Sequence, residues 1–223
     1  MKKSIVIVTP HPDDETLGCG GTILRHRSAG DDVYWLIVTK MNEKSYSKER
    51  VQKRKSEIEE VANKYGFTKI FQLPYEAAKL DEVPASELVS EIGNVFADIE
   101  PNIVYAPYRN DIHSDHKVVF DATMSCTKWF RYPSIEKVLV YETLSETDFI
   151  MNTDANGFRP TTFINISSFL DEKLEIMKIY ESEIAPHPFP RSEEAIRALA
   201  TLRGAAAGAR AAEAFMLVKE RVL

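Results

Sequence analysis

Two short clusters of ionisable residues carry the side chains that could do chemistry in this sequence. The first is His11-Pro12-Asp13-Asp14-Glu15, which places an imidazole and three carboxylates in five positions. Adjacent carboxylates repel one another unless a cation neutralises them. His11 and Asp14 are three residues apart, so on a turn they can point the same way, and this donor pair suits a zinc-like ion. Asp13 would then face elsewhere and be free to act as a base.

The second cluster is Asp111-Ile112-His113-Ser114-Asp115-His116. Two of the five histidines of the chain fall here, again three residues apart, and His11 is a third. Taken singly, each cluster also fits a polar turn in which Asp14, Thr16 or Asp115 caps the following helix. Taken together, a His-Asp-His set leaves the fourth tetrahedral position for water, as hydrolytic zinc sites require.

The elements that must position these clusters follow from the hydrophobic pattern. Short apolar runs predict strands at residues 4–9, 33–39, 67–73, 103–106, 138–141 and, at a sheet edge, 161–166. Amphipathic runs predict helices at residues 15–29, 47–65, 86–99, 116–130, 169–184 and 192–220, with a polar loop at 144–160. The glycines and alanines of residues 204–214 suggest close helix packing.

Alternation of strands and helices predicts an α/β fold with a mostly parallel sheet covered on both faces. Both clusters follow strands that this pattern makes parallel, so both should lie at one edge of the sheet. Open sheets of this kind bind ligands at the carboxyl ends of their strands. The shared location therefore favours a metal site over two unrelated surface turns.

Composition limits the class of protein. A length of 223 residues fits one domain, residues 1–223. The net charge of −6 argues against nucleic acid as a partner. No apolar run is long enough to cross a bilayer or to act as a signal peptide, which predicts a cytoplasmic protein without a membrane span. Cys19 and Cys126 are then expected to be free thiols.

One other metal-binding pattern competes with this interpretation. A His-x-His-x-Asp-His string marks binuclear hydrolases of the metallo-β-lactamase type, and here Asp111 stands in place of its first histidine. That fold is built from runs of strands, however, and it does not account for residues 11–15.

The two clusters together resemble those of the PIG-L/LmbE-like zinc-dependent N-acetyl-sugar deacetylases. Arg203-Gly204 and the segment Ala212-Glu213-Ala214-Phe215 also match this family, so the resemblance runs nearly end to end. Pro10 stands where alanine is commoner and Ser114 where proline is usual, and neither position is a ligand. The resemblance implies a Rossmann-like three-layer sandwich.

The resemblance also implies a role for each ionisable residue of the two motifs. The implied zinc ligands are His11, Asp14 and His116; Asp13 is the general base, His113 stabilises the oxyanion or acts as an acid, and Asp115 orients a histidine. Arg54 of an Arg-x-x-Glu motif, Asp81 and His187 are the implied substrate-binding residues.

The function implied is removal of the acetyl group from an N-acetylglucosamine-type glycoconjugate, with one Zn²⁺ or another divalent transition metal per chain. The family often forms trimers or hexamers, so a homo-oligomer is expected. Two alternatives stay open: a non-catalytic nucleotide-sugar binding module, and a different metal-dependent amidohydrolase. Arg191, Arg197 and Arg203 are expected to be solvated or paired with Glu193 and Glu194, with a substrate phosphate as the alternative partner.

Overall fold

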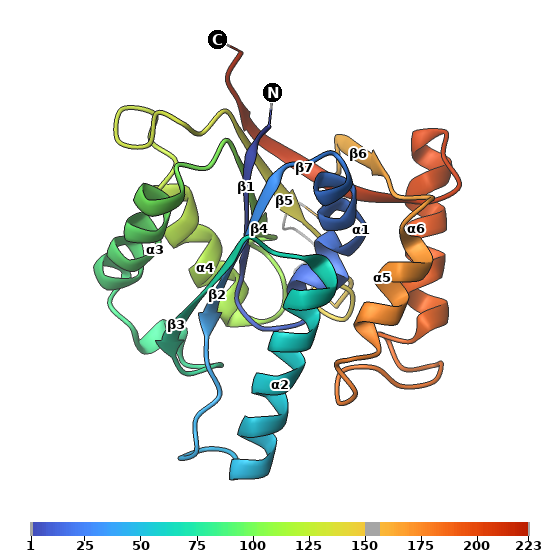
Figure 1. The fold of residues 1–223 in the computed structure, drawn as a ribbon, viewed down its shortest axis with the longest axis horizontal. Coiled ribbons are helices and arrows are strands. Elements are labelled where there is room, and N and C mark those ends of the chain that lie inside the picture. Colours follow the sequence, from blue (N-terminus) through green and yellow to red (C-terminus); the bar gives the residue numbers. More distant parts are fainter. Residues whose placement is uncertain (1, 150–156, 223) are drawn as a thin grey trace.

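The structure is a computed structural model that describes residues 2–149 and 157–222. Within them, one sheet has seven strands in the order β3-β2-β1-β4-β5-β7-β6 (Figure 1). In chain order these are β1 (Ser4–Thr9), β2 (Asp32–Thr39), β3 (Lys69–Tyr75), β4 (Ile103–Pro107), β5 (Lys137–Tyr141), β6 (Thr162–Asn165) and β7 (Ala212–Glu220). The strands from β3 to β5 run parallel, and β7 and β6 join antiparallel at one side.

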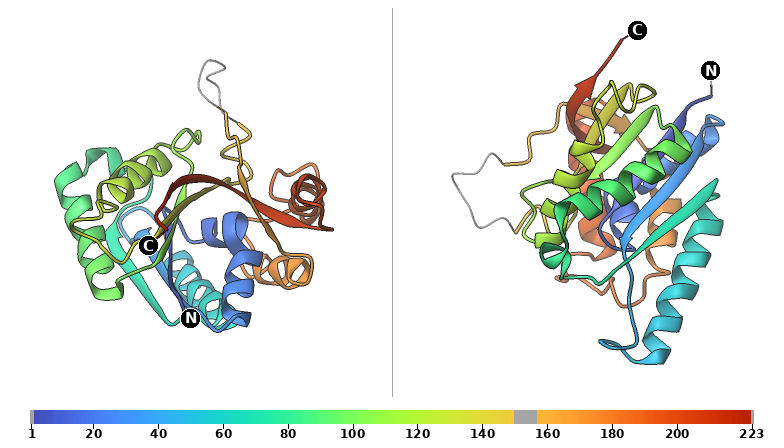
Figure 2. Two further views of the ribbon diagram at one scale, coloured as in Figure 1. Left: turned by 90° about the horizontal axis from the view of Figure 1, so that it is seen from above. Right: turned by 90° about the vertical axis from the view of Figure 1, so that its left-hand side faces the viewer.

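Helices cover both faces of the sheet and make three layers (Figure 2). They are α1 (Asp14–Ser28), α2 (Lys48–Tyr65), α3 (Ala85–Ile99), α4 (Ser114–Ser125), α5 (Leu170–Met177) and α6 (Glu193–Ala207), with a single 3-10 turn at Leu80–Glu82. Helices α3 and α4 pack on one face, and α1, α2, α5 and α6 on the other. The predicted α/β sandwich with a mostly parallel sheet is confirmed. Among the helices of the described residues, none is both long and apolar enough to cross a bilayer.

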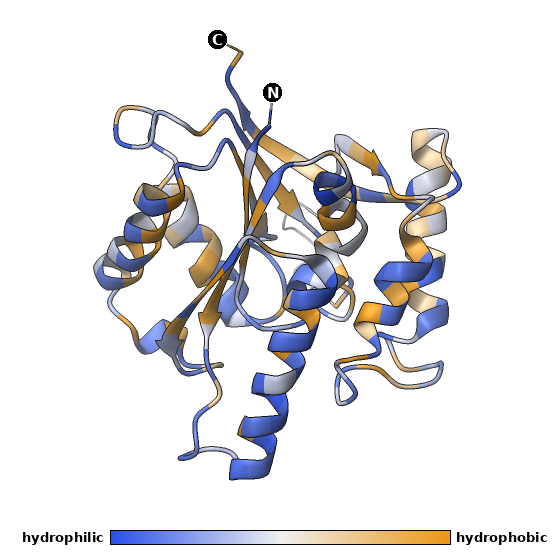
Figure 3. Cartoon of the chain, in the orientation of Figure 1, coloured by the Kyte–Doolittle hydropathy of each residue, from blue (hydrophilic) through white to orange (hydrophobic). Residues whose placement is uncertain are grey.

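Strand β1 shows why the central strands appear in the sequence as unbroken apolar runs. Ile5 and Ile7 point into the core beneath α1 and α2, while Val6 and Val8 point into the core beneath α3 and α4. Both faces of a parallel strand are buried, so the four inner positions of β1, from Ile5 to Val8, are all apolar. Figure 3 shows the result: the strands are mostly hydrophobic, and the outer side of α2 is hydrophilic.

The helix predicted over residues 192–220 is wrong in its second half. Helix α6 ends at Ala207, because Gly208 takes a left-handed conformation with φ 68°. The chain then turns back and forms strand β7, which pairs with β5 and β6. The alanines favour a helix locally, but pairing of the segment around Phe215 between two strands outweighs that preference. Close packing does occur at Gly204, where an added Cβ would lie 2.7 Å from the Ala209 carbonyl oxygen.

Other boundaries differ by less. The helix predicted at 116–130 runs only over Ser114–Ser125, and the one predicted at 169–184 only over Leu170–Met177. Strand β6 lies at the sheet edge, as predicted. The predicted polar loop at 144–160 lies partly outside the described residues. Cys19 and Cys126 are buried free thiols, as expected.

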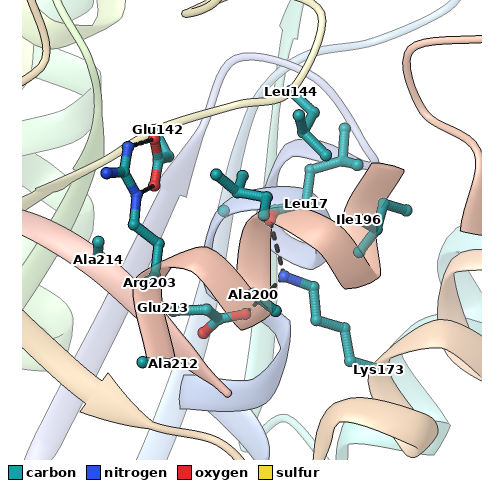
Figure 4. Close-up of a pocket in the computed structure, with 12 residues that line it drawn as sticks. Leu17, Glu142, Leu144, Lys173, Ile196, Ala200, Arg203, Ala212, Glu213 and Ala214 are labelled. Carbon is teal, nitrogen blue, oxygen red and sulfur yellow. Dashed lines mark hydrogen bonds and ion pairs between the residues drawn. The ribbon is translucent and has the colours of Figure 1, made fainter. Parts of the chain in front are cut away.

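A buried ion pair ties the end of the chain to helix α1 (Figure 4). Lys173 of α5 donates to Glu213 of β7 at 2.7 Å and to the carbonyl oxygen of Leu17 at 2.9 Å. Glu213 also accepts hydrogen bonds from the backbone N–H groups of Gly21 and Thr22. Removing one partner of such a pair leaves a buried charge, at a cost of about 3–5 kcal/mol. The network therefore fixes α1, whose first residue is Asp14.

Candidate active site

The two ionisable clusters meet at a switch point of the sheet. Strands β2 and β3 extend the sheet on one side of β1, and β4 and β5 extend it on the other. The loops after β1 and β4 diverge there and leave a crevice at the carboxyl ends of the strands. Residues 11–15 follow β1 and residues 111–116 follow β4, so the prediction that they share an edge is confirmed.

The three predicted ligands converge. Donor atoms of His11, Asp14 and His116 all lie within 4.8 Å of one another. The Asp14 Oδ2 atom is 3.5 Å from His11 Nδ1 and 3.5 Å from His116 Nε2. Asp14 and His116 are buried, and His11 is partly exposed. These separations are long for hydrogen bonds and suit donor atoms that surround one ion.

On each of the His11 and His116 rings, the nitrogen that faces away from Asp14 is hydrogen-bonded to another carboxylate. His116 Nδ1 donates to Asp111 Oδ2 at 2.7 Å, and His11 Nε2 donates to Asp115 Oδ2 at 2.9 Å. Asp111 in turn accepts from Thr147, and Asp115 from the backbone N–H groups at positions 78 and 80. A carboxylate on one ring nitrogen fixes the tautomer and directs the lone pair of the other nitrogen toward a metal.

A second observation supports a metal fit. His116 Nε2 is buried and has no hydrogen-bond partner among the described residues. An unsatisfied buried nitrogen is costly and needs an explanation. A divalent transition metal bound by His116, His11 and Asp14 supplies one. The donor set of two imidazoles and a carboxylate fits zinc.

His11, Asp14 and His116 form a triad of ionisable side chains, and the charge of each depends strongly on the other two. Burial lowers the pKa of His11, but hydrogen bonds with Asp115 and Asp14 outweigh burial and raise it from 6.5 to about 10. Burial would raise the pKa of Asp14, yet the charges of His116 and His11 hold that pKa well below its usual range. A cation in this position would replace protons on the imidazoles.

Neither helix is capped by the residues expected from the sequence, Asp14, Thr16 or Asp115. The N-cap of α1 is Asp13, whose side chain makes no capping hydrogen bond, and the N-cap of α4 is His113. His113 Nδ1 accepts the backbone N–H of Asp115 at 3.2 Å, so the proton of a neutral ring sits on Nε2. Burial and the charge of His11 lower the pKa of His113 to about 4. At neutral pH His113 is therefore a hydrogen-bond donor.

Asp13 is buried beside the triad in a strained conformation, with φ 127°. Its backbone N–H donates to Glu15 at 3.0 Å. Burial raises the pKa of Asp13 to about 8, although the Arg191 guanidinium opposes this rise. A carboxylate with a pKa near neutrality suits a general base.

Arg191 is the main site residue that local sequence reasoning missed. The expectation that it is solvated or paired with Glu193 and Glu194 is wrong: its guanidinium pairs with Asp13 at 2.6 Å, Glu146 at 3.1 Å and Glu183 at 3.3 Å. These carboxylates come from three separate segments, so no spacing along the chain could reveal the contacts. Of the other two arginines, Arg197 pairs with Glu193 as expected and also with Asp171, whereas Arg203 pairs with Glu142.

A cavity of about 260 Å³ opens beside these residues. Its lining includes His11, Asp13, Met41, Tyr46, Arg50, Arg54, His113, Glu146, Glu183 and Arg191. Arg54 is held in the wall by the Pro12 carbonyl oxygen, Glu57 and Glu183. The other two predicted substrate-binding residues lie apart from this wall: Asp81 is exposed in the 3-10 turn, and His187 is exposed in the segment between α5 and α6.

Comparisons with known proteins bear on the family and on the fold. A family model described as PIG-L, GlcNAc-PI de-N-acetylase, matches residues 6–127. The diacetylchitobiose deacetylase of Thermococcus kodakarensis is 26% identical over 97% of this chain and 83% of that protein. Two crystal structures share the fold. The conserved protein TT1542 of Thermus thermophilus has a TM-score of 0.78 at 24% identity, covering 99% of this chain and 97% of that one. GalB, a 4-carboxy-2-hydroxymuconate hydratase of Pseudomonas putida, has a TM-score of 0.75 at 18% identity, covering 100% and 98%.

Proposed function

Because the chain belongs to the PIG-L, GlcNAc-PI de-N-acetylase, family, we propose that it is a zinc-dependent hydrolase that removes the acetyl group from an N-acetylglucosamine-type glycoconjugate. The fold alone does not choose this reaction, since a hydratase shares it. One observation carries the proposal: the unpartnered His116 Nε2 faces Asp14 and His11 at the edge of a cleft that also contains Asp13.

His11, Asp14 and His116 would hold the zinc ion. When bound, the ion supplies Lewis-acid chemistry: it polarises a carbonyl and makes water available as a nucleophile at neutral pH. Asp111 and Asp115 keep the two rings oriented, because each binds the ring nitrogen that faces away from the triad.

The remaining steps use this chain's own side chains. Asp13 takes the proton of the attacking water, and a neutral His113 donates a hydrogen bond from Nε2 to the acetamide oxygen as negative charge develops there. The proton held by Asp13 then passes to the departing amine. The products are acetate and an amino sugar, and no covalent acyl-enzyme forms.

We propose that Arg54, Asp81 and His187 contact the sugar. Arg54 has the strongest support because it lies in the cavity wall. The complete donor set favours an enzyme over a non-catalytic nucleotide-sugar module. A cytoplasmic location and a homo-trimer or hexamer remain predictions.

Acetate release from a panel of N-acetyl sugars, with chelator and with added zinc, tests the function. We expect release that chelator abolishes and zinc restores, and the substrate panel separates a sugar deacetylase from another amidohydrolase. Asp13→Asn should lower kcat by about 10²–10⁴-fold while the variant keeps its metal. Wild-type turnover in that variant would refute the base assignment, and absence of release from every sugar would refute the substrate class.

A further inference from the structure

Arg191 occupies an unusual position for a cation in a cleft. Its side chain is only 15% exposed. Arg191 directly precedes Ser192, which is the buried N-cap of α6. The Ser192 hydroxyl accepts the backbone N–H of Ala195 at 3.1 Å. The guanidinium therefore comes from a fixed point of the backbone rather than from a loose loop.

Its donors are directed at three walls of the cleft. Nε donates to Ser145 Oγ at 2.7 Å, and Nη2 donates to Glu146 at 3.1 Å, both in the segment after β5. Nη1 donates to Asp13 Oδ2 at 2.6 Å and, more weakly, to Glu183 at 3.3 Å. Charge-assisted bonds of this kind are short and geometrically specific.

Asp13, at one end of this network, is held through both its backbone and its side chain. Its φ of 127° is unfavourable for a residue with a side chain, and such strain persists only where the surroundings enforce it. Glu15 holds its backbone N–H, and Arg191 holds Oδ2. Within the described part of the chain, no residue donates a hydrogen bond to the other carboxylate oxygen, Oδ1, so that oxygen is available to a proton.

We propose that Arg191 is the positioning residue of the general base: by binding Oδ2 of Asp13 it fixes the carboxylate so that Oδ1 takes the proton of the attacking water. The inference rests on the proposed deacetylase function. Arg191 acts through Asp13 and does not itself touch the reacting atoms.

A substrate-binding role for Arg191 is less consistent with its contacts. Each of its three nitrogens already donates to the protein. Arg50 lines the same cavity, lies over the Tyr46 ring at 5.5 Å, and has no ion-pair partner among the described residues. Arg50 therefore offers an anionic group on a substrate a guanidinium that is not already paired with a carboxylate.

The test compares Arg191→Gln, Arg191→Lys, Asp13→Asn and the double variant Asp13→Asn/Arg191→Gln in zinc-loaded protein. Arg197→Gln is the matched control, because Arg197 pairs with Asp171 and Glu193 on the surface. Metal content and melting temperature are measured for each variant, together with kcat and KM for the best N-acetyl sugar. Crystal structures of wild type and Arg191→Gln report the orientation of the Asp13 carboxylate.

We expect Arg191→Gln to lower kcat about 100-fold with little change in KM or metal content, since misplacing a reacting group by about 1 Å has this effect. Arg191→Lys should lose roughly tenfold, because a lysine offers a point charge without the planar fork. The double variant should be no slower than Asp13→Asn, because both changes remove the same function.

Three outcomes would overturn the proposal. They are wild-type kcat in Arg191→Gln, a rise in KM at unchanged kcat, and a double variant slower than Asp13→Asn by the full factor of Arg191→Gln. If wild type and Arg197→Gln release no acetate from any sugar, the proposed function fails instead. The structures then decide the inference, since an Asp13 carboxylate unmoved in Arg191→Gln contradicts it.

Discussion

Two histidine–aspartate pairs at opposite edges of the sheet have the same length but different surroundings. His116 Nδ1 lies 2.7 Å from Asp111 at the carboxyl edge, and His26 Nδ1 lies 2.7 Å from Asp31 at the amino edge. The second ring nitrogen distinguishes them. His26 Nε2 is bonded to the Tyr105 hydroxyl at 3.0 Å, whereas His116 Nε2 is buried without a partner.

The surroundings of the pairs explain this difference. Asp31 also accepts the backbone N–H of Lys3, so the His26 pair joins helix α1 to the starts of two strands. Each polar atom of that ring is used for structure. At the carboxyl edge one nitrogen of each ring is held by a carboxylate and the other faces Asp14. A histidine–aspartate pair therefore indicates a metal site only when the second nitrogen is left for a ligand.

The largest contrast is expected between His116→Ala and His26→Ala. His116→Ala removes one of the three proposed ligands, so the purified protein should contain almost no zinc and release no acetate. His26→Ala should keep its full zinc content and lose about 1–3 kcal/mol of stability through unpaired Asp31 and Tyr105. Elemental analysis and thermal melts measure both. Loss of zinc in His26→Ala would remove the distinction between the two pairs.

The carboxylates behind the rings should differ in the same way. Asp111→Asn is expected to weaken zinc binding about 10–100-fold, because Asp111 fixes the tautomer and orientation of His116. Asp31→Asn should leave zinc affinity unchanged. Competition with a chromophoric chelator measures both affinities. Equal affinities in wild type and Asp111→Asn would mean that burial alone orients His116.

Zinc binding should also depend on pH. In chelator-treated protein the pKa of His11 is raised to about 10, with burial opposed by hydrogen bonds with Asp115 and Asp14. Protonated His11 stabilises the metal-free fold fully below its ordinary pKa of 6.5, and this contribution is lost as the pH rises through 10. Zinc must displace that proton, so its affinity should fall roughly tenfold per unit of decreasing pH in this window.

Calorimetric titration in buffers of different ionisation enthalpy measures the protons released on binding. At least one is expected between pH 7 and 9. A zinc affinity independent of pH over that range would show that His11 is neutral before the metal arrives.

The sequence was enough to predict which residues come together where they lie close to the ends of parallel strands, and was not enough elsewhere. His11 and Asp14 lie in the loop after β1 and at the start of α1, and His116 lies in the first turn of α4, which follows β4, so the order of parallel strands brings them together. Arg191 arrives from the segment between α5 and α6, whose path is set by tertiary packing. The strand β7 was missed for a related reason: its alanines favour a helix locally, and only its pairing with β5 and β6 makes it a strand.

The smallest effect is expected at His187, which contrasts with His113, the N-cap of α4. His113 lines the cavity, and His113→Ala should lower kcat about 10²–10³-fold by removing the proposed oxyanion donor. His187 is exposed, so a contact with a sugar hydroxyl would add one solvated hydrogen bond. His187→Ala should therefore raise KM roughly fivefold without changing kcat or zinc content, and His187→Gln should recover part of that loss. Steady-state kinetics on the best sugar decide. An unchanged KM makes His187 a structural residue of its loop, whereas a fall in kcat as large as that of His113→Ala would show that this segment moves into the cleft when substrate binds.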